Sequence, residues 1–168
     1  MAKTFLDQIV EYPAKVMLRI AEDKYCTGLL INKAFDKVGE DEIDTAAEEF
    51  IKDYQYVDDT VQTTAAYIWV EMEVNRVDNK TMKNIRLYVS VACHKNYMAL
   101  NRQTFKGIRG NRRDNIVRFV DRVLNNSEFL GLGALKLRSV KTATPINDFT
   151  IREIEYEIPD FNIVEIEE

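Results

Sequence analysis

Cys93 and His94 are adjacent and combine a nucleophile with a base, so they are the first candidates for chemistry. They lie in an alternating run typical of a β-strand, in which neighbouring side chains point to opposite faces. The thiol and the imidazole therefore cannot meet as a catalytic pair. Cys26 could approach His94 in space, but nothing in the spacing indicates it. We expect two buried thiols, with no support for a disulfide between them, and a surface histidine.

Glu71 and Glu73 share one face of the same predicted strand, and Asp58-Asp59 precede them. Paired carboxylates can bind a divalent metal in nucleases, but no lysine follows either glutamate by two residues. The segment 107–110 has too few glycines for a phosphate-binding loop. A chain with one histidine and no paired cysteine motif does not suit zinc. We therefore predict no catalytic, metal-binding or cofactor-binding residue, with a small enzyme of unrecognised site as an alternative.

The basic residues gather in one segment, residues 95–113, which contains no Asp or Glu. Its six cations are the predicted subunit-interface or DNA-facing residues: Lys95, Arg102, Lys106, Arg109, Arg112 and Arg113. Tyr97 and Phe105 lie among them, and basic residues with interleaved aromatic side chains suit a phosphate backbone or an acidic neighbour. A connection of roughly 16 residues without secondary structure is typical of functional loops. A merely solvated loop is the plainer alternative.

The acidic residues gather elsewhere in a chain of formal net charge −5. Residues 36–59 hold ten acids and two bases, and residues 153–168 hold seven acids and no base. Opposite charges in separate segments offer complementary surfaces to other copies of the chain. The acidic interface candidates are Glu48, Glu49, Asp53, Asp58 and Asp59. A solvated helix from Thr45, capped by Asp44, would explain the same acids without a partner.

Composition indicates an ordinary globular protein. The chain has 168 residues, of which 46% are hydrophobic and 30% are charged. One domain over residues 1–168 is the default for this length. Within it we expect a helical, acidic part over residues 1–60 and a sheet-and-helix core over residues 65–160. No apolar run approaches the roughly 20 residues that span a bilayer, and the N-terminus lacks a signal-peptide pattern. We expect a cytoplasmic protein without membrane contact.

The clearest structural signal is a long hairpin. Apolar and polar residues alternate over residues 68–75 and again over residues 85–94, with Asp78-Asn79-Lys80 supplying turn residues between them. Trp69 and Tyr88 fall on the second, non-core face of this hairpin. We predict them to be exposed aromatic interface anchors. A second layer of core on that face is the alternative.

Helical patterns flank the hairpin. Thr4 can cap a helix through Val10, and Pro13 is expected to interrupt it and begin a second helix. Residues 25–35 are either a loop or a short helix. Asn111 is a good N-cap for an amphipathic helix that ends near residues 125–127.

Two further strands are expected after that helix. One contains Leu135 and Leu137, and the other covers residues 149–158 and ends at Pro159. A bulge near Arg152-Glu153 would reconcile a change of parity in the last strand. This order predicts an α+β fold, with a mainly antiparallel sheet, a long central hairpin and helices packed on one side.

The arrangement from Tyr67 onward resembles the small neck proteins of tailed bacteriophages, the tail-terminator and head-closure group. The likeness is carried by the hairpin, the segment Arg109-Gly110-Asn111-Arg112-Arg113-Asp114 before the amphipathic helix, Gly131-Leu132-Gly133, and a last strand closing with Pro159-Asp160-Phe161.

The resemblance implies a non-enzymatic virion protein, assembled in the host cytoplasm, that forms a homo-oligomeric, usually hexameric, ring in the head-to-tail neck. Its implied partners are the adjoining neck, portal-side and tail-tube or sheath proteins, with possible contact to DNA in the channel. The tail terminator is the first expectation and head closure the nearest variant. A nucleic-acid-binding accessory protein that uses residues 95–113 is the alternative from another class.

Overall fold

The computed structural model describes the backbone of residues 5–55, 63–78 and 82–162, and the side chains of residues 10–55, 63–73 and 85–158. The helices are α1 (Phe5–Ala21), α2 (Lys24–Ile31), α3 (Glu40–Thr45) and α4 (Arg112–Leu124), with short helical turns η1 (Phe35–Lys37), η2 (Ala46–Phe50) and η3 (Lys95–Tyr97). The strands are β1 (Ile51–Lys52), β2 (Ala66–Asp78), β3 (Met82–His94), β4 (Lys136–Ile146) and β5 (Phe149–Asn162).

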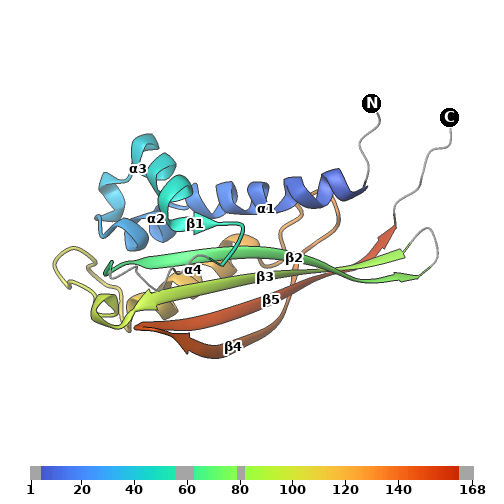
Figure 1. Cartoon of the computed structure of the whole chain (residues 1–168). Coiled ribbons are helices and arrows are strands. Elements are labelled where there is room, and N and C mark those ends of the chain that lie inside the picture. The colour runs from blue at the N-terminus through green and yellow to red at the C-terminus, as the bar shows by residue number, and fades with distance from the viewer. Residues whose placement is uncertain (1–4, 56–62, 79–81, 163–168) are drawn as a thin grey trace.

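The described strands form one sheet in the order β1-β2-β3-β5-β4. β2 and β3 form the predicted long hairpin, and β5 and β4 continue the antiparallel pairing. Among the described strands, only the short β1 pairs in parallel, with β2. Figure 1 shows the helices together on one face of this sheet. The predicted α+β fold is confirmed.

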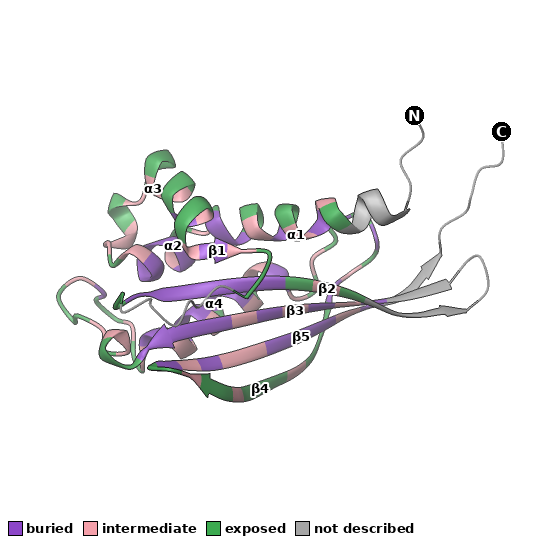
Figure 2. Cartoon of the chain, in the orientation of Figure 1, coloured by how far each residue is buried: buried purple, intermediate pink, exposed green. Residues whose placement is uncertain are grey.

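The main core lies between the helices and the inner face of the sheet. Residues of one parity point inward from the hairpin and β5, including Ile68, Val89 and Tyr156. Val16 of α1 and Val120 of α4 close the core from the helical side. The alternation with period two therefore identifies the inner face of the sheet. Figure 2 shows mostly buried residues along β3 and mostly exposed residues along the edge strand β4.

The outer face of the sheet has an apolar cluster of its own at one end, made by Ala65, Tyr67, Trp69, Ala92, Phe149 and Ile151. Trp69 is only 4% exposed, so its prediction as an exposed anchor is wrong. It is buried in a cluster with Ile151 and Phe149, which is the second layer considered as the alternative. Tyr88 is half-buried, further along the same face.

This outer cluster also explains the change of parity in β5. Pairing between β3 and β5 runs without a shift from Ile85↔Ile158 to His94↔Phe149, so the predicted bulge near Arg152-Glu153 is absent. Phe149 and Ile151 face the outer cluster, whereas Ile154 and later apolar residues face the main core. β5 also continues through Pro159 to Asn162 rather than ending there.

The N-terminal helices differ from their predictions in two places. Pro13 lies inside a continuous α1, since Tyr12, Val16 and Ile20 are buried on either side of it and hold the helix on the core. Pro13 removes one backbone hydrogen bond, and the packing offsets that loss. α3 begins at Glu40, not Thr45, because the Glu42 carboxylate accepts a hydrogen bond from the Gly39 amide, 2.9 Å away.

Residues 24–31 form the short helix α2, one of the two alternatives left open. Asp23 caps it by accepting hydrogen bonds from the amides of Tyr25 and Cys26, both at 3.0 Å. Gly28 is buried there, against the Lys33 carbonyl and the Phe35 aromatic ring. In the described part of the chain, no helix combines the length and apolar content needed to cross a bilayer.

Candidate interaction surface

The candidate surface is the basic loop, residues 95–113, which links β3 to α4. Its first turn is set by Asn101, whose side-chain oxygen accepts hydrogen bonds from the amides of Gln103 (2.8 Å) and Thr104 (3.2 Å). Asparagine stabilises turns in this way. Gly107 and Gly110 have φ angles of +80° and +87°. These values lie in the left-handed region that favours glycine. The sequence therefore builds defined turns into the loop.

Arg112 fastens the loop from inside. It is 2% exposed, so its prediction as an interface or DNA-facing residue is wrong. Its guanidinium donates hydrogen bonds to the carbonyls of Tyr97 (2.8 Å) and Leu29 (2.5 Å) and to Oδ1 of Asn32 (2.8 Å). Burial lowers the pKa of Arg112. A guanidinium nevertheless keeps its proton in a protein. The fork of donors ties the loop to α2.

Two further side chains hold the loop in place. Phe105 is buried and lies 5.3 Å from the Phe35 aromatic ring, between centroids. Asn115 of α4 is buried and donates to the carbonyls of Arg109 (2.7 Å) and Asn111 (2.8 Å). The tip and the end of the loop are therefore both attached to the core.

Two of the predicted cations are already paired within the subunit. Lys95 contacts Asp148 at 2.5 Å, and Arg113 contacts Asp114 at 3.0 Å, next to Arg152. Arg102, Lys106 and Arg109 are exposed, and among the described residues none of the three makes an ion pair. The positive charge available to a partner therefore comes from these three side chains.

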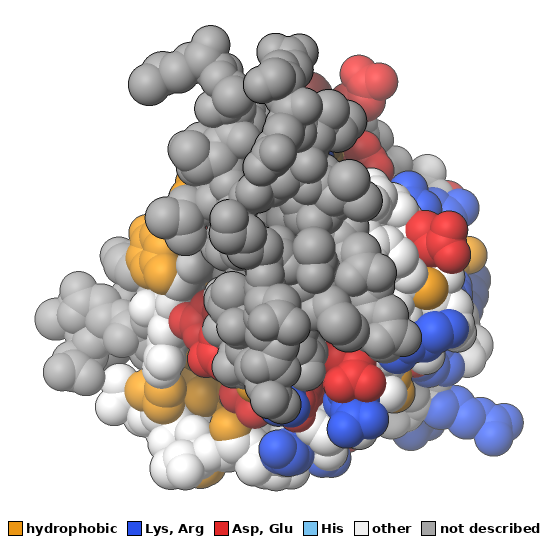
Figure 3. Space-filling view, turned by 90° about the vertical axis from the view of Figure 1, so that its right-hand side faces the viewer, with side chains coloured by type: hydrophobic (Ala, Val, Ile, Leu, Met, Phe, Trp, Pro, Cys, Tyr) orange, Lys and Arg blue, Asp and Glu red, His pale blue; other side chains and the backbone are white. Residues whose placement is uncertain are grey.

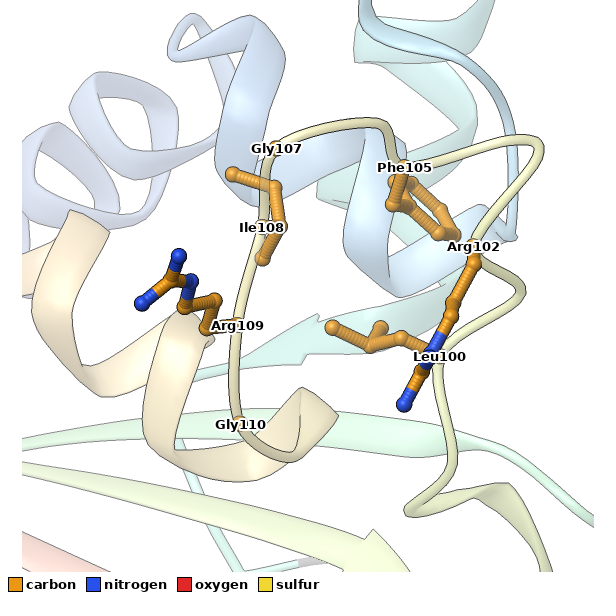
Figure 4. Close-up of a pocket in the computed structure, with 7 residues that line it drawn as sticks. All are labelled: Leu100, Arg102, Phe105, Gly107, Ile108, Arg109 and Gly110. Atoms are coloured by element: carbon orange, nitrogen blue, oxygen red, sulfur yellow. The ribbon is translucent and has the colours of Figure 1, made fainter.

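The loop encloses a pocket of about 460 Å³. Figure 4 shows its two arms, with Leu100 pointing between them and Phe105 at the closed end. Ile108 lines the other arm, and Arg102 lies on the same arm as Leu100. Arg109 projects outward from its arm. A pocket with an apolar floor and nearby cations suits a partner surface in which an apolar side chain lies next to acidic residues.

The acidic candidates are placed on a second surface. Glu48, Glu49 and Asp53 are exposed, whereas Asp58 and Asp59 lie outside the described residues. A hollow of about 380 Å³ is lined by Asp53 together with Glu71 and Glu73, both exposed. Sequence reasoning treated that glutamate pair as a possible metal site. The structure adds it to the acidic surface instead, because β1 pairs alongside β2.

The described acids of the other acidic block, Glu153, Glu155 and Glu157, are not a separate field of negative charge. Strand pairing sets them between two strands that carry cations, and Glu155 contacts Arg86 (2.8 Å) and Lys141 (3.9 Å). Glu157 contacts Arg138 at 3.1 Å. Figure 3 shows basic and acidic side chains lying beside one another on one side of the molecule. Segregation along the sequence is thus partly cancelled by the fold.

The early catalytic candidates, two cysteines and one histidine, are all buried. Cys26 and Cys93 are free and buried, as predicted, but His94 is 6% exposed and not a surface histidine. Its Nδ1 accepts a hydrogen bond from the Asn96 amide at 3.1 Å. In the described part of the chain, no three His, Cys, Asp or Glu side chains are arranged to hold a metal ion.

The fold and these surfaces define a small α+β protein with exposed cations on one loop and exposed acids on another surface. Comparison with known families places it among phage-associated proteins. The family model YomW matches residues 23–158, which cover every element from α2 through most of β5. The chain belongs to the YomW family. No curated protein and no solved structure gives a significant match.

Proposed function

We propose that this protein is a non-enzymatic virion assembly protein that forms a homo-oligomeric ring in the head-to-tail neck and acts as the tail terminator. Its membership of a phage-associated family and its α+β fold with a long hairpin are consistent with the resemblance of its sequence to neck proteins. Head closure in the same neck is the nearest variant of this function.

The observation that carries the proposal is the presence of opposite charges on two separate surfaces. Arg102, Lys106 and Arg109 project from a loop whose backbone is attached to the core by hydrogen bonds. Glu48, Glu49 and Asp53 are exposed on a different part of the fold. A ring uses a heterologous interface, in which one surface of each subunit meets another surface of the next. Such an interface would satisfy both sets of charges.

Charge reversal tests this proposal. A variant with Arg102→Glu, Lys106→Glu and Arg109→Glu should lose self-association and capping of tail tubes, while its circular dichroism and melting temperature stay unchanged. A matched variant with Lys15→Glu, Arg19→Glu and Arg118→Glu has the same change of charge at exposed positions on α1 and α4. It should still assemble.

The second half of the test is compensation. Adding Glu48→Lys, Glu49→Lys and Asp53→Lys to the basic-loop variant should restore assembly, because every interface again pairs opposite charges. Assembly unaffected by the first three reversals would overturn the assignment of this surface.

A nucleic-acid-binding accessory protein is the second candidate, favoured by the same three exposed cations. That function predicts DNA binding by the isolated chain, with log affinity falling by about 0.9 per phosphate contact for each tenfold rise in salt. The acidic reversals would not restore this binding. The compensated variant therefore separates the two functions.

A further inference from the structure

We propose that Tyr54 of one subunit inserts into the pocket of the basic loop of the next subunit. This inference rests on the proposed ring and names the contact that would register it. An interface of exposed ion pairs alone would be weak, because each such pair contributes little. Stable association requires an apolar anchor as well, and the buried Trp69 cannot supply it.

Tyr54 is the exposed side chain that fits this role. It is 53% exposed, and it is the aromatic member of the exposed large apolar residues in the described structure, the others being Val10, Leu18, Leu137 and Val140. Tyrosine is enriched among residues that dominate interface energies, since its large aromatic ring loses little conformational entropy on binding.

The charges around Tyr54 match those around the pocket. Asp53 precedes Tyr54, and Asp53 lines one hollow with the exposed Glu71 and Glu73. The pocket has an apolar lining made by Leu100, Phe105 and Ile108, with Arg102 on one arm and the outward-pointing Arg109 on the other. A second copy therefore presents an aromatic group within an acidic surface to an apolar pocket with a cation on each arm. That match selects another copy of this chain rather than a polyanion.

The pocket has the rigidity that such a contact needs. Phe105 at its closed end is held against Phe35, and Arg112 stacks 3.9 Å from the Tyr97 aromatic ring centroid beneath the loop. The two cations on its arms make no ion pair within the described residues, so binding breaks no bond of that kind. Preorganised sites of this type bind with a smaller entropic cost.

Cross-linking tests the contact directly. In a chain with Tyr54→Cys and Ile108→Cys, oxidation should produce covalent oligomers up to the full ring, since a cysteine from each position meets the other across every interface. The native Cys26 and Cys93 are buried and do not compete. A matched variant with Tyr54→Cys and Gln103→Cys carries the second thiol on the same loop, beside a different hollow, and should not cross-link.

Affinity gives an independent measure. Tyr54→Ala should weaken self-association by about thirtyfold, the size expected for truncating a central aromatic anchor, whereas Tyr54→Phe should stay close to the unsubstituted chain. Both are measured by analytical ultracentrifugation, with circular dichroism to confirm the fold.

The outcomes separate this contact from the ring itself. Rings that form without a 54–108 cross-link, and that tolerate Tyr54→Ala, would overturn the contact and leave the proposed function standing. A chain that never self-associates, alone or with tail tubes, would overturn both.

Discussion

The guanidinium of Arg112 lies over the aromatic ring of Tyr97, 3.9 Å from its centroid, and donates through Nε to the carbonyl of the same residue at 2.8 Å. One side chain thus holds both the backbone and the side chain at the start of the loop. Buried cations of this kind are held by acceptors because an unsatisfied buried charge is very costly. With Leu29 and Asn32 included, these contacts make Arg112 the structural centre of the basic loop.

Replacing Arg112 should therefore unfold or loosen the protein rather than affect assembly alone. Arg112→Ala leaves three acceptors without this donor, and we expect the free energy of unfolding to fall by about 3 kcal/mol. Arg112→Lys should rescue this only in part, because an ammonium cannot reproduce the planar fork. Urea denaturation measures both, and the exposed Arg109→Ala, expected within about 0.5 kcal/mol, serves as the control. Equal stability of all three variants would contradict the anchoring role.

Gly28 is the next sensitive position. A Cβ at this residue would lie 2.7 Å from the Lys33 carbonyl oxygen and 2.8 Å from Cδ1 of Phe35, so α2 or the turn after it must shift. We expect Gly28→Ala to lower the free energy of unfolding by about 2 kcal/mol. Gly39→Ala is the comparison, since the nearest atom there belongs to the flexible Glu42 side chain at 3.4 Å. Its cost should stay below about 1 kcal/mol.

The carboxylate of Asp114 should make stability depend on pH. Partial burial raises its pKa, but hydrogen bonds from Asn111 and the charges of Arg113 and Arg152 outweigh that effect, so the pKa lies below its ordinary value of 3.8. A group with a lowered pKa stabilises the fold above its unfolded value, and the contribution is lost as pH falls through the folded value.

The comparison of wild type and Asp114→Asn isolates this contribution. The melting temperatures of the two chains should differ most near neutral pH and converge in acid, below the ordinary titration range of aspartate. Glu128→Gln, at an exposed position, should leave the melting profile parallel to that of the wild type. A constant difference at every pH would show that Asp114 acts through packing alone.

The two cysteines should not react with thiol reagents in the folded protein. Burial raises the pKa of the Cys93 thiol to about 11 and that of Cys26 well above its ordinary value. The reactive thiolate is therefore scarce, and access is blocked as well. Titration with a thiol reagent in mildly alkaline buffer should count no thiol in the native chain and two after denaturation. Rapid labelling of either residue in the native state would show that its surroundings open.

The sequence predicted the helices and strands that bury only one face against the main core. The hairpin and α4 were predicted correctly because their inward-facing apolar residues recur with the period of a strand or of a helix. Asn111 caps α4 as expected, accepting a hydrogen bond from the Asp114 amide at 2.8 Å. Trp69 and β5 were misread because their sheet buries both faces at one end. Alternation alone does not distinguish a second apolar layer from an exposed patch.

The site was predicted less well than the fold. Residue type and local charge identified the basic loop. They could not distinguish the buried Arg112 from the exposed Arg109, because both are arginines. Only the position of α2, far earlier in the sequence, decides which arginine is buried. Likewise nothing in the sequence around Glu155 and Glu157 indicated the cations that neighbouring strands bring beside them. Such long-range contacts leave no local sequence signal.

Because a buried side chain anchors the basic loop, the exposed residues of the loop can be substituted without changing its backbone. Since the anchor and the outward cations are different side chains, positions 102, 106 and 109 can be randomised together in a display library with little risk to folding. Selection from such a library would yield variants that bind new partner surfaces, while the backbone of the loop stays the same.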